Sequence, residues 1–293
     1  MLWLIGLGLF DEKDVSVRGL ETIQQCDEVF LENYTSILHV PVERLEAFYG
    51  KKVHVADREM VESYAEKILN AAAEKSGAAQ VAFLVVGDPF AATTHADLLL
   101  RAEARGIHVK VIHNASIMNA VAACGLQLYS FGQTVSIPYF TPTWRPRSFY
   151  PRIVANYKAH LHTLCLLDIK VKEVSDENLA RGRKIYEPPR FMTVNEALEQ
   201  LVECEEVEKG NVACLDSLAV GLARVGAPDQ IIRAGTIAEL LEADFGAPLH
   251  ALVIPGPELH ELEYEMLRKM FMAEGSALKN IPFDTYKKTI EKL

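Results

Sequence analysis

AFLVVGDPFAATTH (residues 82–95) has the form of a buried strand followed by a turn and a helix. The apolar, β-branched run from Val81 to Val86 is typical of a strand that is covered on both faces. Gly87-Asp88-Pro89 ends this strand, because glycine permits a sharp turn and proline cannot donate a ladder hydrogen bond. Asp88 is therefore expected at the carboxyl end of a buried strand, where open α/β sheets bind their ligands. An ordinary strand–turn–helix junction would give the same pattern.

Two further segments lead from a strand into a loop of small and polar residues. In MLWLIGLGLFDEKD (1–14) an apolar strand runs into Gly6-Leu7-Gly8-Leu9, which lacks the third glycine of the dinucleotide-binding fingerprint. In VIHNASIMNA (111–120) a short strand precedes a polar turn and a helix that Ser116 can cap. Three such loops in the first 120 residues indicate one composite binding site.

Strand and helix signals alternate from the start of the chain, which predicts a mostly parallel α/β sheet with helices on both faces. A second α/β unit begins near residue 114, so the predicted domains are residues 1–113 and 114–293. Strands are predicted over 2–10, 28–31, 52–56, 81–86, 107–112, 134–137, 164–171, 219–225 and 249–254. Helices are predicted around 17–23, 42–49, 61–73, 98–102, 116–124 and 258–273, with capping boxes of Thr193 with Glu196 and of Thr236 with Glu239.

Composition and charge exclude several classes of function. The chain has 293 residues, 49% of them hydrophobic, and a formal net charge of −10. A sizeable core is therefore expected, and a broad basic footprint for nucleic acid is not, although a local basic patch stays compatible with this charge. The apolar run from Leu2 to Phe10 is too short to span a bilayer and lacks a basic leader, so no membrane segment is predicted.

The cysteines are odd in number and scattered, and no pair has CxxC spacing. Most lie in apolar surroundings, which predicts reduced core thiols in a cytoplasmic protein. They are Cys26, Cys124, Cys165, Cys204 and Cys214.

Many short blocks follow one another through most of the chain. They are MLWLIGLGL (1–9), LENYTS (31–36), VVGDPFAATTH (85–95), VIHNASIMNAV (111–121), CGLQLYSFGQTVSIP (124–138), TWRP (143–146), HTLCLLDIKVKE (162–173), GRKIYEPPRFM (182–192), VGLARVGA (220–227) and PLHALVI (248–254). In this order they resemble the diphthine synthase family, of the tetrapyrrole-methylase-like superfamily of S-adenosylmethionine-dependent methyltransferases. The length and the internal blocks resemble the eukaryotic branch more than the archaeal one.

The resemblance implies a fold of two α/β domains with the cofactor in the cleft between them. It also implies a set of residues that contact S-adenosylmethionine, some through backbone groups and some through apolar walls. These residues are Leu9, Asp88, Ala91, Ser116, Ile117, Leu167, Val225 and His250. Asp88 would balance a cationic group of the donor or accept from a ribose hydroxyl, and the residues leave that choice open.

Two positions depart from the family pattern. Phe10 and Ala91 stand where the family usually has glycine. If the glycine at 91 is needed for left-handed backbone geometry, the loop must shift; if only its amide is used, Ala91 is nearly neutral, which is the interpretation we favour. Phe10 is a candidate for the mouth of the cleft.

The resemblance implies methylation of a modified histidine in translation elongation factor 2 during diphthamide formation. The amino group of a 3-amino-3-carboxypropyl arm would be methylated up to the trimethylammonium, and the eukaryotic branch also converts the carboxylate to a methyl ester. Methyl transfer needs binding and alignment more than a dedicated nucleophile or metal, so no catalytic residue and no metal ligand are predicted. The family is also homodimeric, which implies a homodimer here.

Other interpretations stay open. A methyltransferase of the same superfamily that acts on a small molecule such as a tetrapyrrole, a dinucleotide-dependent oxidoreductase, and a non-catalytic module that binds the elongation factor are the alternatives. His95 and His113 beside the loops are candidates for proton acceptors. His160 and His162 have HxH spacing without an evident third ligand. The loop that contains Tyr139, Trp144 and Arg145 either faces the substrate or is simply packed.

Overall fold

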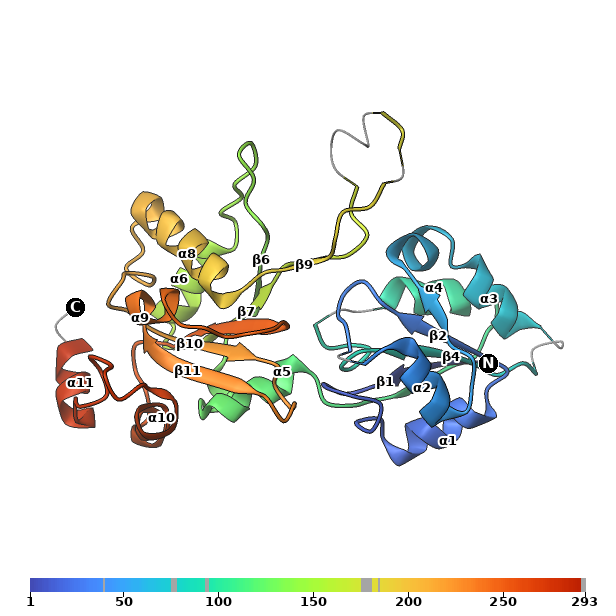
Figure 1. Cartoon of the computed structure of the whole chain (residues 1–293), viewed down its shortest axis with the longest axis horizontal. Coiled ribbons are helices and arrows are strands. Elements are labelled where there is room, and N and C mark those ends of the chain that lie inside the picture. The colour runs from blue at the N-terminus through green and yellow to red at the C-terminus, as the bar shows by residue number, and fades with distance from the viewer. Residues whose placement is uncertain (39, 75–77, 93–94, 175–180, 184, 291–293) are drawn as a thin grey trace. The chain divides into compact units, whose positions relative to one another are not determined.

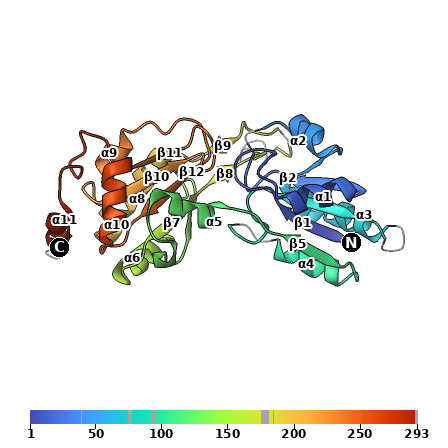
Figure 2. The same cartoon turned by 90° about the horizontal axis from the view of Figure 1, so that it is seen from below.

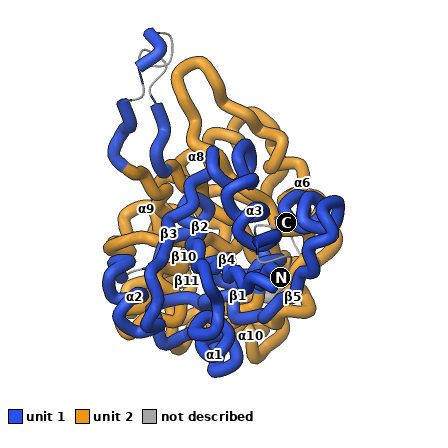
Figure 3. The backbone as a smooth tube through the Cα atoms, turned by 90° about the vertical axis from the view of Figure 1, so that its right-hand side faces the viewer, with its two compact units in different colours: residues 1–118, 171–188 blue, residues 119–170, 189–293 orange. Residues whose placement is uncertain are grey.

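The structure is a computed structural model that describes residues 1–38, 40–74, 78–92, 95–174, 181–183 and 185–290. Thr93 and Thr94 of the opening motif lie outside these residues. The chain forms two compact units (Figure 3): unit 1 is Met1–Met118 with Val171–Pro188, and unit 2 is Asn119–Lys170 with Pro189–Leu293. The domain boundary at residues 113 and 114 stays a prediction, and the return of the chain into unit 1 at 171–188 was not anticipated.

Unit 1 is built on a five-stranded sheet in the order β3-β2-β4-β1-β5, in which every pair is parallel. The parallel α/β arrangement predicted from the alternating pattern is therefore confirmed. Every residue from Val81 to Val85 is at most 1% exposed, as expected for a strand covered on both faces. The strands are β1 (Leu2–Gly6), β2 (Glu28–Glu32), β3 (His54–Ala56), β4 (Val81–Val85) and β5 (Val109–Ile112).

Helices cover both faces of this sheet (Figure 1). One face packs Ile5, Leu31 and Leu84 against α1 and α2, and the other packs Leu4 and Phe83 against α3 and α4. Side chains alternate between the two faces along each strand, so each strand serves both cores. The helices are α1 (Val17–Gln25), α2 (Val42–Tyr49), the π-helix η1 (Glu59–Ser63), α3 (Glu66–Ala73) and α4 (Ala96–Glu103).

Unit 2 contains a second five-stranded sheet, in the order β11-β10-β12-β7-β6. Only β6 and β7 are parallel in it, and the other pairs are antiparallel. Two short strands form a separate antiparallel ribbon (Figure 2). The strands are β6 (Val135–Ile137), β7 (Thr163–Leu167), β8 (Ile169–Lys170), β9 (Arg190–Phe191), β10 (Leu218–Ala223), β11 (Ile231–Thr236) and β12 (His250–Ile254), with β8 and β9 making the ribbon.

The main core of unit 2 lies between its sheet and the helices α6, α8 and α9. Both predicted capping boxes are present, Thr193 with Glu196 before α8 and Thr236 with Glu239 before α9. The remaining helical elements are α5 (Ile117–Ala120), η3 (Val121–Cys124), η4 (Leu128–Ser130), α6 (Tyr150–Lys158), α8 (Val194–Glu208), α9 (Ile237–Leu241), α10 (Glu261–Met266), η5 (Leu267–Phe271) and α11 (Phe283–Ile290).

Five elements of the described chain were not predicted, namely the strands β9 and β11 and the helices η4, α6 and α11. The helices predicted over 61–73 and 258–273 each contain a π-helical turn, η1 before α3 and η5 after α10, where the backbone hydrogen bonds lengthen to i→i+5. All five cysteines are free, and four are buried. No helix of the described chain is long and apolar enough to cross a membrane.

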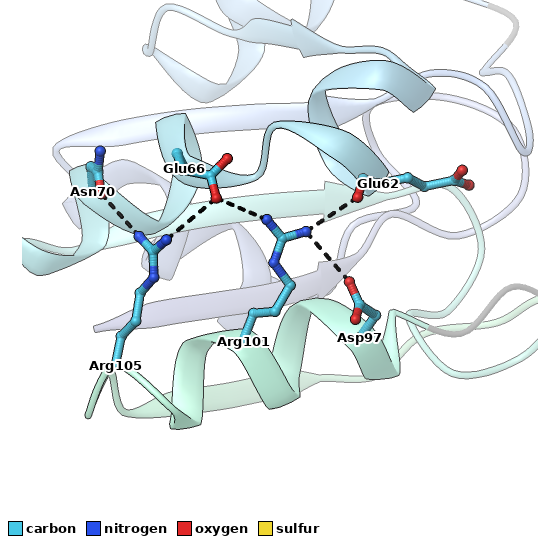
Figure 4. Close-up of polar contacts among 6 residues, drawn as sticks. All are labelled: Glu62, Glu66, Asn70, Asp97, Arg101 and Arg105. Carbon is cyan, nitrogen blue, oxygen red and sulfur yellow. Dashed lines mark hydrogen bonds and ion pairs between the residues drawn. The ribbon is translucent and has the colours of Figure 1, made fainter.

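A cluster of charged side chains joins the surfaces of η1, α3 and α4 (Figure 4). Arg101 contacts Glu66 at 3.1 Å, Asp97 at 3.5 Å and the Glu62 carbonyl oxygen at 3.2 Å. Arg105 donates to Asn70 at 3.0 Å and to Glu66 at 3.4 Å. Most of these groups are solvated, so the cluster contributes little net free energy to folding.

We expect Arg101→Ala to lower the free energy of unfolding by about 1 kcal/mol or less. The loss should shrink in 0.5 M salt, because exposed charges are screened over a few ångströms there. Urea unfolding at low and high salt measures both values. A loss well above 2 kcal/mol that salt does not reduce would show that Arg101 acts through packing instead.

Candidate active site

Three loops of unit 1 meet at the carboxyl edge of its sheet. β1, β4 and β5 are neighbours in the sheet and run in the same direction, so the loops that follow Gly6, Val85 and Ile112 start side by side. This confirms that the three sequence segments come together. The ligand of the site stays a prediction.

The first two loops join through a pair of glycines. The Gly87 amide donates to the Gly8 carbonyl oxygen at 2.7 Å, and the Gly8 amide donates to the Gly87 carbonyl oxygen at 3.2 Å. Both glycines have positive φ, +80° at Gly8 and +79° at Gly87. A Cβ on Gly8 would lie 2.6 Å from the Cβ of Asp14, so both the positive φ and the nearby Asp14 side chain require glycine at this position.

Asp88 connects the second and third loops. Its Oδ2 accepts from the Asn114 amide at 3.0 Å and lies 2.9 Å from Nδ1 of His113, and its Oδ1 accepts from the Phe90 amide at 2.9 Å. Burial by itself raises the pKa of Asp88, but these hydrogen bonds outweigh burial and bring the pKa below its ordinary value. Asp88 is therefore an ionised carboxylate at neutral pH, at the carboxyl end of β4.

Asp14 and Asn114 hold the first loop in place, a role that was not predicted for either residue. Asp14 Oδ2 accepts from the amide of Leu9 at 3.1 Å and of Phe10 at 2.8 Å. The Asn114 side-chain amide donates to the carbonyl oxygens of Gly6 at 3.0 Å and Asp14 at 2.9 Å. An amide side chain two residues after a strand end is the local signal that would have indicated Asn114.

The third loop begins α5 as predicted. Ser116 is buried, and its Oγ accepts from the Met118 amide at 3.2 Å, which is the hydrogen bond of an N-cap. Ile117, the first residue of α5, is half-buried. Leu9, Asp88, Ala91 and Ser116 thus lie on the three loops of unit 1, and Ile117 begins the helix that follows the third.

Ala91 does not adopt positive φ, and its amide donates to the Asp88 carbonyl oxygen at 3.3 Å. The loop therefore accommodates alanine without strain. We expect Ala91→Gly to cost about 0.4–1 kcal/mol of stability through the added freedom of the unfolded chain. The affinity for S-adenosylmethionine, measured by calorimetry, should stay within about twofold of the wild-type value. A tenfold gain in affinity would show instead that the alanine methyl obstructs the site.

The remaining three predicted residues lie at one edge of the unit 2 sheet. β7 ends at Leu167, and β12 begins at His250, which pairs with Ala223 at the end of β10. Because β12 is antiparallel to both β7 and β10, its first residue lies at the edge where they end. Val225 follows β10 by two residues, so the fold of unit 2 brings Leu167, Val225 and His250 to the same edge.

Both ring nitrogens of His250 have backbone partners. Nδ1 accepts from the Val194 amide at 3.3 Å, which places the ring proton on Nε2, 3.0 Å from the Ala247 carbonyl oxygen. Burial lowers the pKa of His250 below its ordinary value. A ligand contact at His250 would therefore use its backbone or the face of its ring.

Arg224 holds the loop that carries Val225, a role that was not predicted for this residue. It has φ of +50° and is 8% exposed. Its guanidinium donates to the Phe245 carbonyl oxygen at 2.9 Å, to the Ala247 carbonyl oxygen, and to Asp229 Oδ2 at 2.7 Å. No sequence signal indicates this role, since an arginine after a strand is usually solvated.

Two histidines that were candidates for functional roles, His95 and His162, are held by contacts within the fold. His95 is 4% exposed and packs edge-on against Phe83, and burial lowers its pKa to about 4. His162 Nδ1 accepts from the Gly256 amide at 2.9 Å, and its Nε2 lies 3.2 Å from Glu263. Within the described residues, no three His, Cys, Asp or Glu side chains gather as metal ligands.

The aromatic loop of unit 2 combines packing with exposure. Tyr139 is held by Asp168 Oδ2, which accepts from its amide at 3.0 Å, whereas Trp144 is 54% exposed. Arg145 is ion-paired with Glu203 and lies over the Phe140 ring. Tyr139 is therefore anchored, and that the loop faces the substrate stays a prediction.

Comparison with known proteins identifies the family. Residues 1–241 match the family of tetrapyrrole (corrin/porphyrin) methylases. The diphthine methyl ester synthase of Schizosaccharomyces pombe is 58% identical over 268 residues, 92% of this chain and 93% of that protein. The human diphthine methyl ester synthase is 56% identical over 281 residues, 94% of this chain and 97% of that protein. A crystal structure of diphthine synthase superposes with a TM-score of 0.78 and 33% identity over 95% of this chain and 98% of that one. The chain therefore belongs to the tetrapyrrole methylase family and, within it, to the family of the diphthine methyl ester synthases.

Proposed function

We propose that this chain is the methyltransferase of diphthamide biosynthesis that acts on translation elongation factor 2. The observation that carries the proposal is 56–58% identity to diphthine methyl ester synthases over more than nine-tenths of the chain. The acceptor is the 3-amino-3-carboxypropyl arm on a histidine of the factor. Its amine becomes trimethylammonium and its carboxylate becomes a methyl ester.

The proposed methyl donor is S-adenosylmethionine, which supplies a methyl group already activated on a sulfonium. Asp88 supports this choice, because it is an ionised carboxylate at the sheet edge where parallel α/β proteins bind ligands. A cationic donor suits a fixed negative charge. The residues that we propose contact the donor, as the family resemblance implies, are Leu9, Asp88, Ala91, Ser116, Ile117, Leu167, Val225 and His250.

The contribution of the protein to methyl transfer is mainly alignment. Holding the donor methyl and the acceptor in line is worth about 7–11 kcal/mol of barrier. The interlocked glycines at 8 and 87 and the three bonds to Asp88 give the loops of unit 1 the fixed backbone that alignment requires. The acceptor amine must be neutral to attack, and water can take its proton, so we assign no general base.

We further propose that the chain works as a cytoplasmic homodimer. The buried, free cysteines support a reducing compartment. The dimer rests on the family resemblance alone. Light scattering of the purified chain would give the oligomeric state directly.

A labelling experiment tests the function. The chain is incubated with methyl-labelled donor and with elongation factor that carries the arm, and in parallel with factor whose histidine is unmodified and with a tetrapyrrole. Label on the arm-bearing factor alone supports the proposal. Label on the tetrapyrrole alone would overturn it in favour of a small-molecule methyltransferase. Absence of both transfer and donor binding would indicate a non-catalytic module.

A further inference from the structure

The ribbon of unit 2 places two cations opposite each other. β8 and β9 pair antiparallel, with Lys170 opposite Arg190. Directly paired residues project from the same face of a ribbon, so Lys170 and Arg190 lie on one side of it.

Arg190 is held by an aromatic ring but not by an acid. Its guanidinium carbon lies 5.1 Å from the centre of the Tyr139 ring. Among the described residues, no hydrogen bond or ion pair engages its side chain, and Arg190 is exposed. Arg145 and Arg147 differ, because Glu203 and Glu208 pair with them. The ring contact holds the Arg190 guanidinium beside Tyr139 and leaves its N–H groups available for a planar anion.

The ribbon is attached to the edge that carries Leu167. β8 begins two residues after Leu167, and the carbonyl oxygen of the intervening Asp168 accepts from the Met192 amide at 3.0 Å. Oδ2 of Asp168 accepts from the amide of Tyr139, the residue under Arg190. One aspartate thus ties the end of β7 both to the ribbon and to the tyrosine that contacts Arg190.

We infer that Arg190, with Lys170 opposite and Tyr139 beneath it, binds a carboxylate of the reacting molecules. Arginine is the side chain best suited to this role, because its fork matches the two oxygens of a carboxylate. The inference rests on the proposed function, in which two such groups take part: the carboxylate of the acceptor arm and the methionine carboxylate of the donor.

Carboxylate binding at Arg190 has a consequence for the ester-forming step. The methyl ester carries no charge, so it loses the attraction that held the acid. If the arm is the ligand, Arg190 selects the acid as substrate and favours release of the ester. The product would then bind more weakly than the substrate.

The test uses Arg190→Gln and Arg190→Lys, with Arg233→Gln as the matched control. Arg233 is an exposed arginine of β11 without a role in the proposed site. For each variant we would measure the KM and kcat for arm-bearing elongation factor, the Kd for that factor, and the Kd for S-adenosylmethionine and its decarboxylated analogue. Circular dichroism and thermal unfolding show whether each variant is folded.

We expect Arg190→Gln to weaken the binding of one carboxylate about 10–100-fold, the range for a hydrogen bond to a charged group. Arg190→Lys should fall between that variant and wild type, because it keeps the charge but loses the fork. A rise in the KM and Kd for the factor identifies the arm. A loss for S-adenosylmethionine that is absent for the decarboxylated analogue identifies the donor.

Unchanged affinity for both the factor and the donor in a folded Arg190→Gln protein would overturn the inference. Equal losses in Arg233→Gln would also overturn it, because they would report only the net charge. If the wild-type chain neither binds nor methylates the factor, the proposed function fails, and the two donor affinities still decide whether Arg190 binds a carboxylate.

Discussion

Asp88→Asn is expected to weaken the binding of S-adenosylmethionine about 10–100-fold. The substitution removes the negative charge from the edge of the unit 1 sheet and turns an acceptor into an NH2 group. Both oxygens of Asp88 accept hydrogen bonds, Oδ1 from the Phe90 amide and Oδ2 from the Asn114 amide. The NH2 group of an asparagine would therefore face one of these N–H groups and could not accept from it. A hydrogen bond to a charged group is worth about 1.5–3 kcal/mol, and losing that free energy weakens binding about 10–100-fold.

Calorimetry with S-adenosylmethionine and S-adenosylhomocysteine measures this effect. A larger loss for the first ligand would show that the carboxylate acts on the sulfonium, because the second lacks it. Asp97→Asn is the control, because Asp97 is an exposed residue of α4 outside the proposed site, and its carboxylate lies 3.5 Å from Arg101 (Figure 4). Wild-type affinity of Asp88→Asn for both ligands would remove Asp88 from the proposed site.

Glu205→Ala is expected to lower the free energy of unfolding by about 3–5 kcal/mol. Glu205 lies on α8, 9% exposed, and accepts from the amides of Asn211 at 2.7 Å, Val212 at 2.9 Å and Ala213 at 2.8 Å. The Tyr150 hydroxyl also donates to it. Alanine would leave these donors unpaired in a place that water barely reaches, which is why the expected loss is large.

The contribution of Glu205 to the free energy of unfolding decreases as the pH falls. Burial by itself raises the pKa of Glu205, but the hydrogen bonds from Tyr150 and the three amides outweigh it and lower the pKa. The contribution to stability is therefore complete above the unfolded-state pKa of about 4.3 and is lost as the pH falls through the folded-state pKa below it. The difference between wild type and Glu205→Ala should narrow as the pH falls through that range.

Urea unfolding followed by circular dichroism gives these free energies. Glu206→Ala is the matched control, because Glu206 is the next residue of α8 and is exposed; its effect should be within about 0.5 kcal/mol. Glu205→Gln keeps one acceptor and should lose less than the alanine variant. A loss below 1 kcal/mol in Glu205→Ala would contradict the importance of this carboxylate.

Local chemistry accounts for the features that could be predicted. Gly87 and Pro89 mark the end of β4 because they limit the backbone at their own positions. The capping boxes at Thr193 and Thr236 were predictable because each is made within four residues. β11 was missed because Arg233 and Gly235 interrupt its apolar pattern, and its pairing with β10 supplies the missing stability.

The networks that hold the site could not be predicted in the same way. Arg224 contacts carbonyl oxygens more than twenty residues away, and Lys172 of the returning segment pairs at 3.1 Å with Asp57, which is 115 residues distant. Such partners are set by the path of the chain, and any solvated arginine or lysine has the same local pattern. The resemblance to a family indicated which residues belong to the site but not what orders them.

The sequence alone determined the parallel α/β class of unit 1, the three strand-end loops and the family, because each depends on residues close together in the chain or on blocks in a fixed order. Only the tertiary structure decided that the Asp88 carboxylate is shared between two loops, that Ala91 fits without strain, and that both nitrogens of His250 are engaged. The physical reason is that a hydrogen bond requires its donor and acceptor within about 3 Å, and folding alone brings together groups so far apart in the chain.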